Sequence, residues 1–130
     1  MSAALKFETI KPDEEVAGQL VDMEIHAVRS GREYLFLVLD DENALEPRRV
    51  FVSYSLTGPT ARHSHEQIRN LLVLAMGEQV ADEKIEERGL EALEEIRGMR
   101  LRVLAKPVRT RARPDRTYVQ YVWSVPGALR

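Results

Sequence analysis

Apolar and polar residues alternate with a period of two over residues 16–28 and again over residues 48–56. This period is typical of strands with one buried face, and the almost wholly apolar stretch 33–40 between them is typical of a strand covered on both faces. A turn at residues 29–32 contains Gly31, which predicts a hairpin. The charged loop 41–47 then connects to the third strand, so the first half of the chain is predicted to form a three-stranded meander.

The period becomes helical in the middle of the chain. Ser64 and Gln67 have the spacing of a capping box, which predicts a helix beginning at about Ser64 and ending at Gly77 in the left-handed conformation. Residues 78–95 carry eight acidic and two basic side chains among scattered apolar residues, which predicts one or two amphipathic helices broken near Gly89. Period two returns over 99–105, and residues 117–125 are rich in β-branched and aromatic residues, so two further strands are expected.

Three strands, helices and two strands follow one another in an order that resembles the oligonucleotide/oligosaccharide-binding (OB) fold. We therefore expect a mainly β protein, a five-stranded OB-like Greek-key barrel with a helical insertion, residues 64–96, between strands three and four. Residues 1–130 are expected to form one domain with a polar leader at 1–14. The rival is an open α+β sheet with the same element order, because periodicity does not reveal strand pairing.

More narrowly, the layout is similar to that of phage-type OB-fold single-stranded DNA-binding proteins. The segments that carry the likeness are Val16-x-Gly18, the Gly31 hairpin, Ala75-Met-Gly77 and the closing 118–126. The sequence given ends Pro126-Gly-Ala-Leu-Arg130, without the acidic tail of many such proteins. The resemblance implies binding along the outer face of strands two and three and at the loops joining strands one to two and four to five.

Charge is divided unevenly along the chain of 130 residues, although the net charge is only -2. Residues 1–96 hold ten basic and twenty acidic side chains, whereas residues 97–130 hold nine basic side chains and one aspartate. The basic connection 106–116 predicts an extended arm that binds phosphate, or else a solvated hairpin tip. Its cations are Lys106, Arg109, Arg111, Arg113 and Arg116.

Alternation also predicts an aromatic face. If the leucines of 33–40 and the valines of 48–56 point inward, then Tyr34, Phe36, Arg49 and Phe51 point outward together. Bases stack on such rings for about 1–3 kcal/mol each, whatever their sequence. The alternative is that Phe36 and Phe51 are core residues covered by a helix or by the leader. Together with Tyr118 of the last strand and the arm, these four residues form the predicted nucleic-acid site.

Other chemistry is not indicated. The chain has no cysteine, and no catalytic constellation, phosphate-cradling glycine motif or nucleophile elbow can be identified. Asp22, Glu24 and His26 are better explained as the wet face of a strand than as metal ligands. We thus expect no enzyme activity, no cofactor and no metal.

The expected function is sequence-tolerant binding of single-stranded nucleic acid, with DNA as the first candidate ligand and the choice between DNA and RNA left open by the sequence, in phage-type replication or recombination. The alternative is a protein-interaction or assembly module that uses the 106–116 arm and the acidic 78–95 segment, in either case with homo-oligomers possible. No stretch is apolar enough to span a membrane and no apolar export signal follows the basic start, so a cytoplasmic protein without membrane contact is expected.

Overall fold

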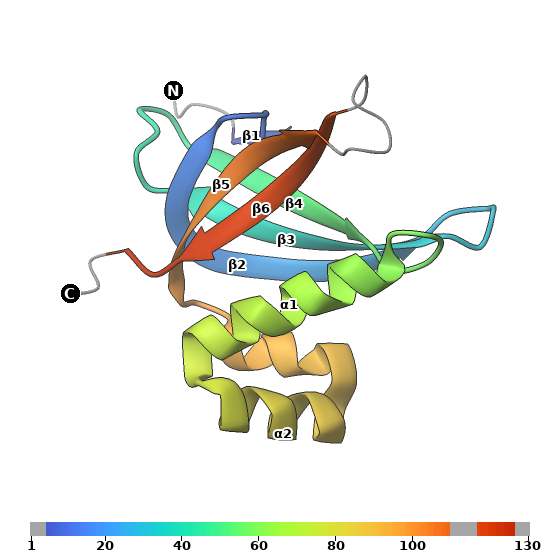
Figure 1. The fold of residues 1–130 in the computed structure, drawn as a ribbon. Coiled ribbons are helices and arrows are strands. Elements are labelled where there is room, and N and C mark those ends of the chain that lie inside the picture. Colours follow the sequence, from blue (N-terminus) through green and yellow to red (C-terminus); the bar gives the residue numbers. More distant parts are fainter. Residues whose placement is uncertain (1–4, 110–116, 127–130) are drawn as a thin grey trace.

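A computed structural model describes residues 5–109 and 117–126. Its strands are β1 (Lys6–Thr9), β2 (Glu15–Ala27), β3 (Glu33–Asp41), β4 (Arg48–Ser55), β5 (Arg100–Arg109) and β6 (Thr117–Ser124). Between β4 and β5 the chain forms α1 (Ala61–Met76), α2 (Glu78–Arg88) and a 3-10 segment, η1 (Gly89–Ile96), which lie beneath the sheet in Figure 1. The protein is therefore mainly β, and β2 to β6 fall where the sequence predicts strands.

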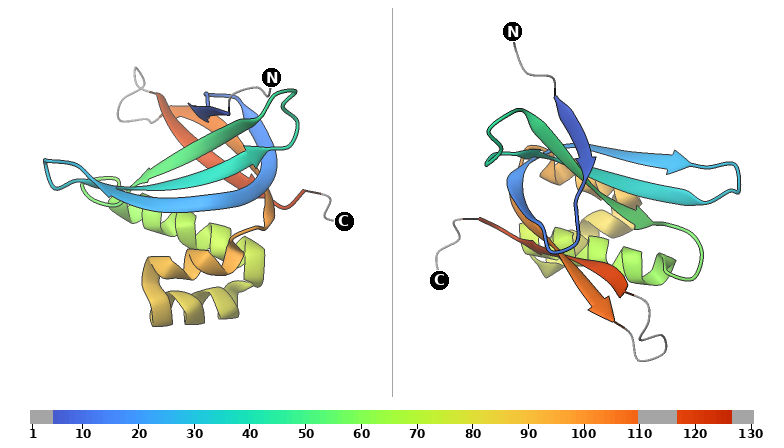
Figure 2. Two further views of the ribbon diagram at one scale, coloured as in Figure 1. Left: turned by 180° about the vertical axis from the view of Figure 1, so that it is seen from behind. Right: turned by 90° about the horizontal axis from the view of Figure 1, so that it is seen from above.

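One mixed sheet contains all six strands, in the order β1-β4-β3-β2-β5-β6. The pairing of β1 with β4 is parallel, and the other pairings are antiparallel. The long strand β2 pairs with β5 through Glu15–Gln19 and with β3 through Gly18–Ala27, so it bends from one wall to the other. The result is a curled, barrel-like sheet, which Figure 2 shows from behind and from above.

The expected number of strands is wrong, because the segment interpreted as a polar leader contributes a sixth strand. Lys6–Thr9 pairs with Arg48–Phe51, about forty residues away in the chain. Four residues are too few for a period to be recognised, and a parallel partner so distant leaves no local signal. The leader therefore belongs to the sheet.

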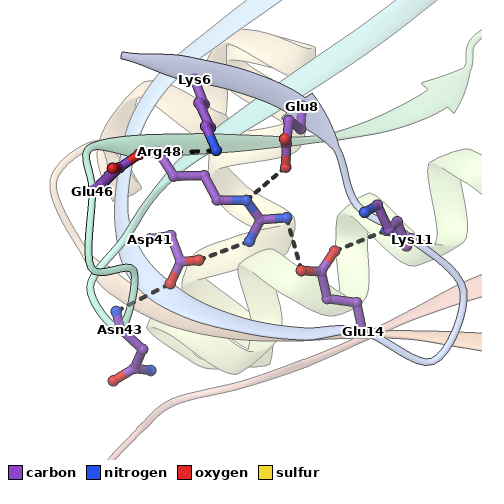
Figure 3. Close-up of polar contacts among 8 residues, drawn as sticks. All are labelled: Lys6, Glu8, Lys11, Glu14, Asp41, Asn43, Glu46 and Arg48. Carbon is purple, nitrogen blue, oxygen red and sulfur yellow. Dashed lines mark hydrogen bonds and ion pairs between the residues drawn. The ribbon is translucent and has the colours of Figure 1, made fainter. Parts of the chain in front are cut away.

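Besides its backbone ladder with β4, β1 is linked to the rest of the sheet by ion pairs of Arg48. The guanidinium of Arg48 donates to carboxylates of Glu8, Glu14 and Asp41, each at 2.8 Å, as Figure 3 shows. Its side chain is only 16% exposed. The hydrogen bond from Arg48 lowers the pKa of Glu8, because it favours the ionised carboxylate. β1, the turn before β2 and the end of β3 thus share one cation.

Gly18 lies where β2 changes partner. A Cβ built at this position would lie 1.6 Å from the carbonyl oxygen of Asp40, far inside any real contact. Just beside it, the amide of Glu42 donates to the carbonyl of Ala17 at 3.0 Å. The two backbones therefore approach closely only because residue 18 has no side chain.

The first helix begins earlier than the capping-box pattern predicts. Ser64 already donates its amide to the carbonyl of Thr60, so it lies within the first helical turns rather than at the cap. Ser64 and Gln67 are buried, and the side chain of Gln67 hydrogen-bonds His63. The helix begins at Ala61, directly after the turn that contains Pro59 and the N-cap residue Thr60.

The glycine breaks of the helical segment are close to expectation. Gly77 has φ 88°, as a left-handed cap requires, but its ψ of 157° lies outside the left-handed helical region. The chain consequently turns directly into α2 rather than closing the predicted cap. α2 ends at Arg88, beside the break expected near Gly89.

The core lies between the inner face of the sheet and the helices. Leu37, Leu39, Val50 and Val52 are fully buried in one cluster with residues of α1 and η1, including Leu72. The helices thus cover the inner face of β3 and β4.

The seam between β4 and β6 is bridged by side chains. Among the described residues, β6 has a backbone ladder with β5 alone. Across the seam, the indole nitrogen of Trp123 donates to the Tyr54 hydroxyl at 2.8 Å, and the rings of Tyr54 and Tyr121 meet edge to face at 5.4 Å. Burial raises the pKa of Tyr54, while the hydrogen bond from Trp123 opposes the shift. Aromatic contacts therefore hold the two walls of the sheet together.

Candidate nucleic-acid interface

The outer face of β3 and β4 carries the aromatic residues that alternation predicts there. Leu35 and Leu37 of β3 are buried, whereas Tyr34 and Phe36, which alternate with them, are half-buried. On β4 the same holds for Arg49 and Phe51, which flank the buried Val50. The register pairs Val38 with Phe51 and Asp40 with Arg49, so these outward side chains share one surface.

Four rings form a continuous run across this surface. Phe7 of β1 lies 5.3 Å from Phe51, and Phe51 lies 5.6 Å from Phe36 with the two rings nearly perpendicular. The ring of His26 from β2 then meets the edge of Phe36 at 5.1 Å. The run therefore crosses β1, β4, β3 and β2, and we call these four residues the ring run.

Sequence reasoning missed the two outer members of the ring run. Phe7 lies in the segment interpreted as leader, and its 57% exposure makes it the most open of the three phenylalanines. The interpretation of His26 as part of a solvated strand face agrees with its exposure. Its contact with the ring of Phe36 follows only from the β2–β3 register, which pairs His26 with Tyr34. The one local signal for Phe7 is its alternation with Leu5.

The ring run and its neighbours line an open groove with a volume of about 470 Å³. The buried Val38 and the phenylalanines are apolar lining, and Val28 and Tyr34 extend it toward the hairpin. The remaining lining residues are Glu24 and His26, joined by a hydrogen bond of 2.8 Å between Nε2 and the carboxylate. Apolar rings with a few polar groups at one side provide a stacking surface for a flat ligand.

The alternative that Phe36 and Phe51 are core residues is wrong, because neither ring belongs to the core cluster. No described residue of the helices lines this groove, because the helices pack on the opposite face of the sheet. The leader does contribute, since Phe7 of β1 packs on Phe51. Both rings consequently lie on the outer face and keep partial exposure.

Cations border the groove unevenly. Within the described part of the chain, Arg49 has no ion-pair partner, and it lies in register with Phe7 on one side and Asp40 on the other. Arg29 and Arg32 are exposed at the hairpin tip beyond Val28. A backbone phosphate near the ring run could therefore meet positive charge at either end.

The basic arm is only partly described. Lys106 and Arg109 of β5 are exposed, and Tyr118 of β6 is 44% exposed. Arg111, Arg113 and Arg116 lie outside the described residues. β2 separates β5 from β3 in the sheet, and no ring contact among the described residues joins Tyr118 to the ring run. The structure thus brings together Tyr34, Phe36, Arg49 and Phe51, but not these four with Lys106, Arg109 and Tyr118.

The acidic segment lies with the helices, away from the groove. Arg69 of α1 bonds Asp82 and Glu78 of α2, while Glu86 and Glu87 are exposed. No described side chain of α2 or η1 borders the ring run, so their negative charge does not face the candidate surface.

Searches against protein-family models and against curated proteins found no match to this chain. In the described residues, no group of three histidine or acidic side chains is arranged to hold a metal ion. None of the helices that the structure describes combines the length and apolar character needed to cross a membrane.

Proposed function

We propose that the protein binds single-stranded nucleic acid, DNA in the first instance, without strong sequence preference. The observation that carries the proposal is the ring run, four rings in successive contact on a face left uncovered by the helices. Every base has a π-face, so stacking on phenylalanine contributes about 1–3 kcal/mol per base with little regard to sequence. A row of rings suits an extended strand of bases better than a single small ligand.

The finer assignment of the fold, an OB-like Greek-key barrel, belongs to the same proposal. Three features support it: β2 pairs with both β3 and β5, the helical segment separates β4 from β5, and aromatic contacts bridge β4 and β6. In OB folds the second and third strands of the barrel carry the ligand. In this chain those strands are β3 and β4, which carry Phe36 and Phe51.

Phosphate binding would come from cations at the ends of the ring run and from the arm. Arg49 is beside Phe7, while Lys106 and Arg109 are the described cations of the 106–116 arm. Neutralised phosphates release counterions, which makes binding depend on salt. The proposed role is that of phage-type single-stranded DNA-binding proteins in replication or recombination.

A fluorescence titration with a poly-dT oligonucleotide tests the proposal. Binding is expected at about 50 mM salt and should weaken steeply as salt rises. No binding at micromolar protein in low salt would overturn the proposal.

Truncating Phe7 tests base stacking more cleanly than truncating the other rings. Because Phe7 is the most exposed of them, its loss should change the folding stability little. Phe7→Ala should weaken binding by about 5- to 150-fold, the equivalent of one base that no longer stacks on a ring. Leu45→Ala removes a fully exposed apolar side chain elsewhere and is the matched control, expected to bind as the wild type does. Equal binding by both variants would exclude stacking on Phe7.

A protein-interaction module is the second candidate, and one observation favours it. An open groove of about 600 Å³ lies between α1 and the α2–η1 segment, with Ile68, Leu72 and Ile85 among its apolar lining. Exposed carboxylates such as Glu86 and Glu87 lie on the same helical segment and suit a basic partner. Failure to bind oligonucleotide, with an intact fold, favours this candidate.

A further inference from the structure

An acidic side chain borders the ring run. Glu24 of β2 lines the groove beside Phe36, and the β2–β3 register pairs these two residues directly. Paired residues of neighbouring strands have Cβ atoms about 4.5–5.5 Å apart, so the carboxylate is within reach of a flat ligand stacked on the ring of Phe36. A phosphate would be repelled from this position, whereas a hydrogen-bond donor would be attracted to it.

The register places further outer-face residues on the two sides of the ring run. One side has the carboxylates of Asp22, Glu24 and Asp40, with Arg49 near its Phe7 end, and the other has the hydroxyls of Tyr34 and Thr9. Hydroxyl groups donate to phosphate oxygens, while carboxylates repel them. A nucleic-acid strand that stacks on Phe36 consequently turns its phosphates toward the hydroxyl side and the edge of its base toward the carboxylate side.

Of the three carboxylates, Glu24 is the one that a ligand in the groove can reach. Asp22 is ion-paired with Arg97, whose Nη1 lies 3.6 Å from its Oδ1, and Asp40 does not line the groove. The side chain of Glu24 is 55% exposed. Within the described residues it accepts one side-chain hydrogen bond, from Nε2 of His26 to Oε2. This bond restrains the carboxylate and leaves Oε1 as an acceptor without a partner in the described part of the chain.

We propose that Glu24 gives the site a preference for bases with an exocyclic amino group, by accepting a hydrogen bond from that group when the base stacks on Phe36. Cytosine carries an amino donor at position 4, where thymine and uracil carry a carbonyl acceptor. The one ring donor of thymine or uracil lies between two carbonyl oxygens, which the carboxylate repels. The inference rests on the proposed function, and it adds a modest selection to stacking that itself accepts every base.

Binding of two matched oligonucleotides to the full chain tests this preference. Oligodeoxycytidine and oligodeoxyuridine of equal length share one backbone and both lack the 5-methyl group, so their bases differ only at position 4 and at N3. At mildly alkaline pH, fluorescence titrations should show about 2- to 13-fold tighter binding of the deoxycytidine strand, the contribution of one hydrogen bond. Equal binding of the two strands would overturn the inference and leave the proposed function in place.

Glu24→Gln tests whether the carboxylate causes the preference. The amide offers both a donor and an acceptor, so this variant should bind the two strands about equally. Asp40→Asn removes the same charge from another exposed position on β3 and is the matched control, in which the wild-type ratio should persist. Loss of either negative charge should strengthen binding of both strands alike, so the ratio of the two affinities is the readout. A wild-type ratio in Glu24→Gln, or the same altered ratio in both variants, would contradict the role of Glu24.

A cationic peptide is the other ligand that a carboxylate beside aromatic rings can hold, through cation–π contacts. Positive side chains at both ends of the ring run, Arg49 and the hairpin residues Arg29 and Arg32, oppose such a ligand. A lysine-rich peptide titrated in parallel should therefore bind more weakly than oligodeoxycytidine. Binding of the peptide but of neither oligonucleotide would overturn this inference together with the proposed function.

Discussion

Replacing Gly18 by alanine tests the close approach on which the bend of β2 depends. The added Cβ would lie 1.6 Å from the carbonyl oxygen of Asp40, and real contacts of this kind are not shorter than 3.0 Å. The two backbones must therefore separate by about 1.4 Å, the difference between these distances. That movement takes the bond from Glu42 to Ala17, now 3.0 Å, beyond hydrogen-bonding distance.

The expected loss in the free energy of unfolding follows from the backbone hydrogen bonds that this movement breaks. Leaving the bond from Glu42 to Ala17 unmade costs about 1–3 kcal/mol, and loss of a second ladder bond at this crossing would bring the total to about 2–6 kcal/mol. Urea unfolding followed by circular dichroism measures it, with the slope m unchanged if the denatured state is unaffected.

Gly31→Ala is the control for the same substitution without the clash. No atom lies within 4 Å of a Cβ at this position, although its φ of 84° makes alanine strained. We expect a loss of about 1–2 kcal/mol for Gly31→Ala. If Gly18→Ala were no more destabilising than Gly31→Ala, the close approach at Gly18 would not be the constraint described.

Two further predictions concern charge. Changing Arg109, Arg111 and Arg113 to alanine should reduce the log–log salt slope of oligonucleotide binding by about 0.7 for each phosphate that the arm no longer neutralises, without changing base preference; an unaltered slope in fluorescence titrations would mean that the arm is a solvated hairpin tip. Because Arg48 lowers the pKa of Glu8 in the folded state, the stability that this carboxylate contributes is present above its unfolded pKa, near 4.5, and is lost as the pH falls through the lowered value. Arg48→Met should flatten this acid-side decline in thermal melts between about pH 5 and 3, and parallel profiles for the two proteins would contradict it.

Local patterns in the sequence account for most of the strands. Alternation predicts β2, β4 and β5, residue type predicts β3 and β6, and Gly31 predicts the first hairpin, because these features depend on neighbours in the chain. β1 could not be found in this way, since its partner β4 is about forty residues distant. The expected helix start is wrong for a related reason: Ser64 and Gln67 resemble a cap in sequence, but burial against the sheet determines their role.

The candidate site was predictable only within each strand. Period two is sufficient to place Tyr34 and Phe36 on one face of β3, and Phe51 on the same surface follows once β3 and β4 are paired. Phe7 and His26 enter the ring run through pairings that no short window of sequence contains. The arm is evident from composition, whereas the separation of its described cations, Lys106 and Arg109, from the rings depends on the position of β2 in the sheet.

The shortness of β1 determines where ligand binding would first be detectable in the protein. This strand holds the most exposed ring of the candidate site by four ladder positions and one shared guanidinium. Such an element opens by local fluctuation at a smaller free energy than global unfolding, so its amides exchange with solvent ahead of those in the core. A ligand stacked on Phe7 binds only the closed form, and it must therefore slow hydrogen exchange in residues 6–9 before any comparable change reaches β5. Exchange at the first strand would thus detect occupancy more sensitively than the melting temperature of the whole molecule.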